Sequence, residues 1–398
     1  MLNKESKHPI GSYCELNNIT PVSNLVKGLD FRKPEYRRET FMRFYEFHLK
    51  YRAHPGAVYF MFNYLRERFN LTQEDMLWLT YINGVDQHIV TTWELFSKFP
   101  KFTSDADEMQ QYIMDNWKQL GWDMDRRYVK TKFGEALKGY QKLIKENTKS
   151  NTQEEFWGDL CATEDEHANF RACWDMVINN FPFFGRLSTF SYLEYQRIIG
   201  LHLDCDQLFL EDMSGSKSHR NGLAVVLGRD DMDWHDKINP DFEGYRPEHL
   251  DWLKAEGAKL LDEAKIRFQG RDFYRDVSYF TLESTLCCYK SWHRPNRRYP
   301  NVYMDMFHDR IKKAEEATNN EKDFSLFWDA RKKYLPKELR LEDNPQDCGL
   351  KPDKQNHYRL TGQPIMMHID WDCFENDFAK NQYTPLDNHF FSLEASLG

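Results

Sequence analysis

Residues 214–229 are the first segment whose side chains could do chemistry. They include Lys217, Arg220 and Arg229 and no acidic residue, although the whole chain has 54 Lys and Arg against 63 Asp and Glu, a formal charge of −9. Small residues let a backbone approach a ligand closely, and N–H groups beside cations suit phosphate. The segment therefore predicts a cationic anion-binding loop. The alternative is a solvated turn before a buried helix or strand at 223–227.

A second segment without acidic residues covers 290–298. It holds four Lys or Arg residues and one histidine; Trp292 lies within it, and Tyr299 and Tyr303 follow it. Cations beside aromatic rings suit a phosphodiester backbone together with stacked bases, whereas most Lys/Arg runs are only solvated surfaces. The candidate DNA- or amino-acid-binding residues here are Lys290, Trp292, His293, Arg294, Arg297, Arg298 and Tyr299.

Carboxylates follow the first cationic segment directly. Asp230, Asp231, Asp233 and Asp236 lie within seven residues. They could hold Mg²⁺ opposite a phosphate, position an amine, or form structural salt bridges with nearby arginines, and the last interpretation is favoured. The sequence contains no Walker, metalloprotease, Gly-x-Ser-x-Gly or Gly-x-Gly-x-x-Gly signature.

The cysteines and the apolar residues narrow the class of protein further. None of the eight cysteines is spaced Cys-x-x-Cys, so we expect free thiols and place no residue in a metal site, although ligands scattered through the chain could still converge. No stretch approaches the roughly 18 apolar residues that a membrane helix needs, and residues 1–5 lack the apolar core of a signal peptide. We therefore expect a cytoplasmic protein without a membrane partner.

Helices must position these segments, because strand-like alternation is scarce. Thr72 with Asp75 predicts an N-cap, for a helix that carries Leu77, Leu79, Ile82 and Trp93; Thr152 with Glu155 predicts a second capping box. Further predicted helices cover 41–49, 59–69, 165–180, 248–268, 276–293, 302–317 and 324–334. We expect a mainly α protein with an N-terminal helical region (1–150) packing on a core (151–340), and an irregular C-terminal extension (341–398).

Residues 181–193 resemble the helix-hairpin-helix of base-excision DNA glycosylases. In that family the hairpin N–H groups grip a DNA phosphate, and an aspartate about twenty residues later faces a flipped nucleotide. Gly185 and Arg186 match the motif, and Asp206 falls near the place of that aspartate. Phe183 replaces the first hairpin glycine, and Leu187 stands where some members have a lyase lysine. The resemblance implies a helical glycosylase-like core with its hairpin near 181–200.

Longer motifs across 174–375 resemble a narrower family, the phage amino acid:DNA transferases, also called α-glutamyl/putrescinyl thymine pyrophosphorylases. The motifs are Ser216–Gly222, Gly228–Asp231, Thr281–Ser284 with Cys287–His293, and Arg297–Tyr303. The resemblance implies action on double-stranded DNA that carries 5-(pyrophosphoryloxymethyl)uracil, in the cytoplasm of an infected host. A free amino acid or polyamine would displace pyrophosphate from the exocyclic methylene.

That chemistry implies roles for the residues already named. A departing pyrophosphate needs cations and N–H donors, and an attacking amine needs a base. The candidate pyrophosphate-binding residues are Arg186, Lys217, Ser218 and Arg229, and the candidate catalytic residues are Asp206, His219, Arg220, Asp230 and Asp231. Asp206 is the first choice of base, and Glu283 is either structural or orients a cation. No cofactor is expected to be required, although Mg²⁺ could join the leaving group.

Two other functions stay open on the sequence. A DNA glycosylase acting on a modified base would share base flipping but attack C1′, and would release free base. A non-catalytic DNA-binding phage protein would use both cationic segments only for phosphate contacts.

Overall fold

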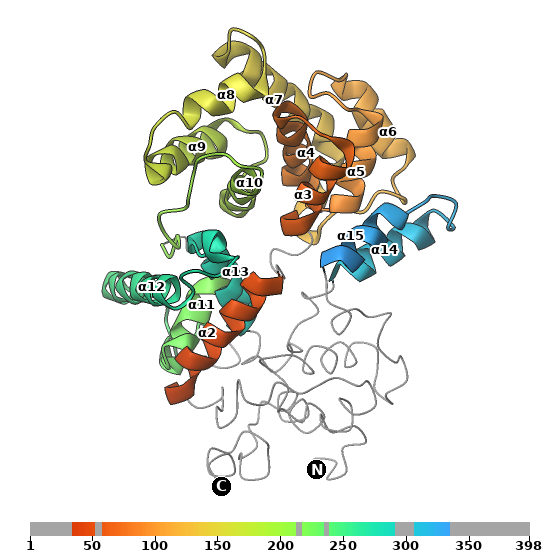
Figure 1. Ribbon diagram of the computed structural model, residues 1–398. Helices are drawn as coiled ribbons and strands as arrows, with labels where there is room; N and C mark the ends of the chain where they lie inside the picture. The colour runs from red at the N-terminus through yellow and green to blue at the C-terminus, as the bar shows by residue number, and fades with distance from the viewer. Residues whose placement is uncertain (1–33, 52–57, 212–216, 235–238, 291–305, 335–398) are drawn as a thin grey trace, which may run out of the picture. The chain divides into compact units, whose positions relative to one another are not determined.

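A computed structural model describes residues 34–51, 58–211, 217–234, 239–290 and 306–334 of the 398-residue chain. Within these ranges the regular elements are all helices and no strand occurs (Figure 1). The expectation of a mainly α protein is therefore confirmed. No helix in the described part is both long enough and apolar enough to span a bilayer.

The chain packs as two units, each built from separate segments of sequence. The first contains residues 1–56, 207–306 and 335–398, and the second contains 57–206 and 307–334. Packing into units does not decide which segments fold on their own, so the expected boundaries at 150 and 340 stay a prediction. The expected extension at 341–398 lies outside the described residues.

Among the described residues, the first unit gathers four α-helices around one apolar core. They are α2 (Pro34–Tyr51), α11 (Lys217–Val226), α12 (Pro247–Arg267) and α13 (Tyr279–Tyr289), with short turns η3 (Asp230–Met232) and η4 (Tyr274–Asp276). Phe41 and Tyr45 of α2 pack with Leu223 of α11 and Leu286 of α13 in this core. Residues 217–222, expected to be a loop, instead form the start of α11, because packing against α13 outweighs the weak helix propensity of Ser, Asn and Gly.

The second unit is built around α4 (Gln73–Asp86), whose residues from Met76 onward are all buried. A helix buried all round needs neighbours on every side. Its other elements are α3 (Val58–Phe69), α5 (Ile89–Lys98), α6 (Ala106–Asp115), η2 (Met124–Lys132), α7 (Phe133–Asn147), α8 (Gln153–Leu160), α9 (Glu166–Asn180), α10 (Arg186–Ile198), α14 (Met306–Ala317) and α15 (Ser325–Tyr334).

The positions of the helix ends can be compared with the N-caps predicted from the sequence. Thr72 and Asp75 form the predicted capping box of α4. The prediction that the same helix reaches Trp93 is wrong, because α4 ends at Asp86, Gln87 adopts a left-handed φ of 52°, and Trp93 belongs to α5. Thr152 caps α8, but the Glu155 carboxylate accepts from the N–H groups of residues 149 and 150, so only half of the second box forms.

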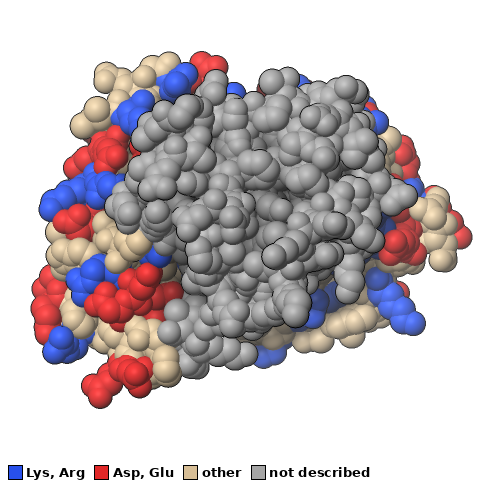
Figure 2. All heavy atoms as spheres, turned by 90° about the horizontal axis from the view of Figure 1, so that it is seen from below, with Lys and Arg blue, Asp and Glu red and all other residues tan. Residues whose placement is uncertain are grey.

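Charges of both signs are interspersed on the protein surface. On the face shown in Figure 2, the visible described side chains include Lys and Arg next to Asp and Glu. Many charged side chains of the described residues are paired, such as Arg267 with Glu39 and Lys254 with Glu211. The net charge of −9 therefore does not describe every part of the surface.

One buried carboxyl group in the second unit titrates far from its usual range. Burial raises the pKa of Asp86 to about 8, although the His88 N–H and the Thr92 hydroxyl donate to its Oδ1 at 2.9 and 2.8 Å. Burial, together with Arg310 and Lys130, lowers the pKa of the neighbouring His88 to about 3. Both side chains are therefore neutral in the folded protein near pH 7.

We predict that replacing Asp86 by Asn removes a pH dependence of stability. Because the pKa of Asp86 is raised on folding, its contribution is full below about pH 4 and is lost as the pH rises to about 8. The contribution of His88 has the opposite sign and changes only below its unfolded pKa of about 6.5. Between pH 6.5 and 8 the wild type should lose about 2 kcal/mol more than the variant in urea unfolding. If the free energies of unfolding of the two proteins changed in parallel with pH, the prediction would be contradicted.

We also predict that Gly222→Ala destabilises the first unit. A Cβ at Gly222 of α11 would lie 2.1 Å from the Leu286 carbonyl oxygen of α13, so the two helices would have to separate. The expected loss of stability is about 2–4 kcal/mol, measured by urea unfolding. Gly158→Ala in α8 is the matched control, since its Cβ would meet nothing within 4 Å. Equal effects of the two changes would show that the close approach is unimportant.

Candidate functional site

The hairpin between α9 and α10 is anchored by aromatic side chains of the second unit. Phe181 and Phe184 are buried, with the Phe181 ring 5.2 Å from that of Tyr140 and the Phe184 ring 5.3 Å from that of Tyr192. A Cβ on Gly139 of α7 would lie 2.3 Å from Pro182, so this helix also touches the hairpin closely. The hairpin is therefore held by packing on both sides of Phe183.

Phe183 has the backbone conformation of a glycine. Its φ is +64°, a left-handed value that is strained for a bulky residue. Its carbonyl oxygen accepts hydrogen bonds from Arg126 Nη1 at 2.8 Å and from the Tyr128 hydroxyl at 3.3 Å. The sequence departs from glycine at this position, but the turn of the backbone keeps a conformation that favours glycine.

Gly185 and Arg186 start α10. The Gly185 N–H donates to Ser188 Oγ at 3.0 Å, and Arg186 is the first residue of the helix. The Arg186 guanidinium lies 5.7 Å from the Phe190 ring, while Leu187 is exposed. The first N–H groups of a helix have no partner within the helix itself, so this end of α10 has donors available for an anion.

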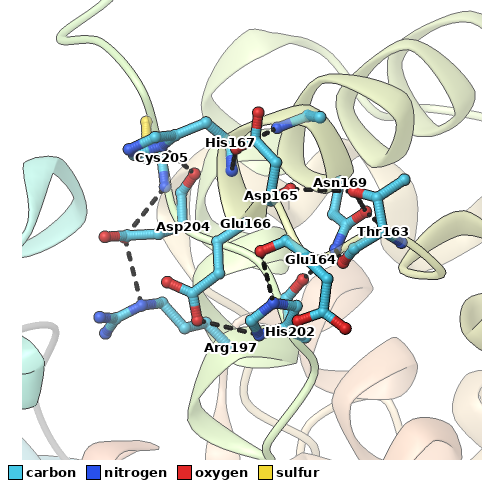
Figure 3. A network of polar contacts seen from close by, with 11 residues as sticks. Thr163, Glu164, Asp165, Glu166, His167, Asn169, Arg197, His202, Asp204 and Cys205 are labelled. Carbon is cyan, nitrogen blue, oxygen red and sulfur yellow. Dashed lines mark hydrogen bonds and ion pairs between the residues drawn. The ribbon is translucent and has the colours of Figure 1, made fainter.

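The segment after α10 is fixed by a polar network (Figure 3). Asp204 Oδ1 lies 3.2 Å from Arg197 Nε, and the Asp204 carbonyl oxygen is 3.1 Å from His167 Nδ1. Asn169 Nδ2 donates to the His202 carbonyl oxygen at 2.8 Å. Contacts from both α9 and α10 thus hold the chain just before Asp206.

Asp206, the first candidate base, is held by one arginine. Its Oδ2 accepts from Arg171 Nη1 at 2.8 Å, while its buried Oδ1 has no hydrogen-bond partner among the described residues. Buried carboxylate oxygens normally have partners. The position therefore leaves one oxygen of Asp206 available to a further donor.

In the first unit, two of the sequence motifs meet where α11 packs against α13. His219 of α11 is only 1% exposed, and its Nδ1 lies 3.1 Å from Glu283 Oε1 of α13. Ser218 Oγ accepts a hydrogen bond from Lys290 at the end of α13. Residues 64 and 72 positions apart in sequence are thereby brought together.

Arg220 is a buried cation in the same helix. Its Nη1 donates to the Leu210 carbonyl oxygen at 2.6 Å, and its guanidinium lies 4.7 Å from the Tyr245 ring. The side chain is completely buried. A fully buried arginine that donates to a backbone carbonyl orders its surroundings, so the geometry gives Arg220 at least a structural role.

Two carboxylates of the cluster after α11 form ion pairs with arginines. Arg37 of α2 forms a two-pronged ion pair with Asp230, and Arg229 forms another with Asp231 at 2.7 and 2.6 Å. The geometry agrees with the structural interpretation that the sequence favoured, and the catalytic roles of both aspartates stay a prediction. Within the described part of the chain, no group of three or more ligand-type side chains could hold a metal ion.

Several predicted site residues cannot be placed in this way. Trp292, His293, Arg294, Arg297, Arg298 and Tyr299 lie outside the described residues, and so does the side chain of Lys217. Lys290 is the one member of the second cationic segment that the structure describes, and it points to Ser218.

The sequence pattern did not reveal that His219 would meet Glu283. The only available signal was that Glu283 lies in a motif shared with the resembled family. The sequence interpretation also overlooked Arg126 and Tyr128, which bind the hairpin carbonyl. Their signal is the run 126–134, which contains four lysines and arginines and no acidic residue.

Comparisons with known proteins agree with the motifs. The family model described as "Amino acid:DNA transferase" matches residues 61–298, more than half of the chain. A protein named Serinyltransferase from Salmonella phage ViI is 25% identical over 352 residues, covering 85% of this chain and 84% of that protein. No solved structure matches. The chain belongs to the amino acid:DNA transferase family, and the protein is a transferase.

Proposed function

We propose that this protein joins an amino acid to 5-(pyrophosphoryloxymethyl)uracil in double-stranded DNA. The amino nitrogen forms a C–N bond with the exocyclic methylene, the C–O bond to pyrophosphate breaks, and pyrophosphate leaves with the electron pair. The nitrogen must also lose a proton. Family membership supports the transfer of an amino acid to DNA, and the resemblance of the motifs supports this particular modified base.

The meeting of His219 with Glu283 is the observation that carries the proposed mechanism. A carboxylate near one imidazole nitrogen fixes the ring and favours a tautomer in which the other nitrogen can accept a proton. Both ring nitrogens of His219 are buried without a hydrogen bond among the described residues, so the 3.1 Å approach of Glu283 to Nδ1 is a close contact that is not aligned as a hydrogen bond. An incoming amine would supply a partner for Nε2. We therefore assign His219 as the base and Glu283 as a positioning residue.

Asp206 is the competing base. Its free Oδ1 could also accept a proton from an amine, but Arg171 holds the other oxygen. Asp206 belongs to the second unit and His219 to the first. Mutating them separately therefore distinguishes the two assignments.

The cations near the helix ends have matching proposed roles. Charge grows on pyrophosphate as it leaves, and cations held in place stabilise it without reorganising. Lys290, which donates to Ser218, is the best-positioned candidate for pyrophosphate or for the amino acid carboxylate. Arg186, Lys217 and Arg229 stay candidates for the same task.

We also propose that the 181–185 hairpin acts on DNA as glycosylase hairpins do. The glycine-like φ of Phe183 and the exposed N-terminus of α10 at Gly185 support this role. The hairpin would hold a phosphate while the modified base turns out of the helix. Flipping is needed because chemistry on a stacked base is otherwise sterically restricted.

Serine is the first amino acid to test. The relative from phage ViI is named for serine transfer, and it matches along most of both chains. Glycine, glutamate, ornithine and putrescine are the other candidates. The carboxylate-binding cations proposed above would suit the amino acids but not putrescine.

We predict that the protein, DNA carrying the pyrophosphorylated base, and serine yield a seryl-modified thymidine and one equivalent of pyrophosphate. Nucleoside mass spectrometry and a pyrophosphate assay measure the two products, with other amines and EDTA in parallel reactions. Unmodified DNA is the control. Absence of both products with every amine would refute the proposal, and release of free base would instead indicate a glycosylase.

We predict that His219→Asn lowers the transfer rate by about 10²–10⁴-fold, the usual range for loss of a general base. Glu283→Gln should lower it by about 10–100-fold, because the ring loses its orienting charge. DNA affinity should change little in either variant. Single-turnover rates across pH provide the test, and circular dichroism checks folding. If Asp206→Asn removes activity and His219→Asn does not, Asp206 is the base.

A further inference from the structure

Another cationic run lies outside the two segments without acidic residues described above, 214–229 and 290–298. Residues 126–134 contain Arg126, Arg127, Lys130 and Lys132 and no acidic residue. Residues 124–132 form η2, which leads directly into α7. The structure separates these four cations into two kinds.

Arg126 and Lys130 are buried and structural. Arg126 donates from Nε to the Val85 carbonyl oxygen at 3.1 Å and from Nη1 to that of Phe183 at 2.8 Å. Lys130 Nζ donates to the carbonyl oxygens of Trp117 and Leu120 at 2.7 and 2.6 Å. These bonds fasten η2 to the end of α4, to the hairpin and to the segment after α6. They leave little freedom for the turn to move.

Arg127 and Lys132 are of the other kind. Both are exposed, and within the described ranges neither has a carboxylate at ion-pair distance. Between them lies Tyr128, whose side chain is 57% exposed. Arg127 and Lys132 are therefore cations without a carboxylate partner among the described residues, on a turn that the hydrogen bonds of Arg126 and Lys130 hold in place.

This exposed group borders the hairpin. The Tyr128 hydroxyl donates to the Phe183 carbonyl oxygen at 3.3 Å, and Lys132 Nζ lies 5.1 Å from the centre of the Phe183 ring. Phe183 is the hairpin residue with the left-handed φ. The strained hairpin and the exposed cations are therefore parts of one continuous surface.

We propose that Arg127, Tyr128 and Lys132 bind the phosphodiester backbone of the substrate DNA next to the hairpin. This inference rests on the proposed function, which makes DNA the substrate, and extends it to a surface outside the recognised motifs. Unpaired cations bind phosphates, and the counterions condensed on the DNA are released. An exposed ring adds a face on which a base or sugar can pack. The buried pair, Arg126 and Lys130, holds these groups in place before DNA arrives.

The test is the salt dependence of DNA binding by an Arg127→Ala/Lys132→Ala double variant. Two lost phosphate contacts should lower the slope of log affinity against log salt by about 2, and should weaken binding by about tenfold or more at ~0.1 M salt. Fluorescence anisotropy with a labelled duplex provides the measurement. Tyr128→Ala should weaken binding more than Tyr128→Phe, because only the former loses the ring.

A double variant of α7, Lys138→Ala/Lys142→Ala, is the matched control. It removes the same charge, but both lysines have acidic partners, Asp107 at 2.6 Å and Glu146 at 3.8 Å. Its salt slope should stay close to that of the wild type. If the two double variants show equal slopes and affinities, the proposed surface is wrong.

The proposed function can fail separately from this surface. If the wild type transfers an amino acid to DNA but the η2 variant binds like the control, only the surface is refuted. If the wild type yields no transfer product, the proposed function fails, and the slope comparison still decides whether η2 contacts DNA.

Discussion

The close approach of α11 to α13 is the constraint on which the first unit depends. It requires a residue without a side chain at Gly222, since the Leu286 carbonyl oxygen occupies the space of a Cβ. The same approach places His219 against Glu283 and Ser218 against Lys290. A single small residue thereby lets two motifs that are distant in sequence come into contact. Packing and chemistry are difficult to separate at this contact.

Many charges that stand out in the sequence are paired with other groups of the same unit. Asp230 binds Arg37 of a helix that begins almost two hundred residues earlier, and Asp231 binds its own neighbour Arg229. Arg126 and Lys130 satisfy backbone carbonyl groups. Charged groups are rarely buried without partners, so a protein rich in charge uses much of it internally. The charges that remain without partners are the more informative ones.

The helical class and several helix starts could be predicted because they depend on local signals. Thr72 and Asp75 act within four residues of each other, and Asp165 caps α9 by the same local chemistry. The end of α4 was missed because the residue that takes the left-handed conformation there is Gln87, whereas the only glycine close by, Gly84, stays within the helix. The start of α11 was missed because its helical form depends on contact with α13. The partners of His219 and Asp230 could not be predicted from the sequence for a related reason, because only the folded chain brings these residues close to them.

The division of the chain has a consequence for anyone who wishes to study its parts. Within the described residues, the second unit is made from 58–206 and 307–334, and the first contains the chain before and between these segments. The described polypeptide therefore passes from one unit to the other three times. A fragment cut at any single position removes material from at least one unit and leaves its remaining pieces incomplete. Dissecting the enzyme into working halves would require rejoining segments in a new order, with linkers in place of the natural crossings.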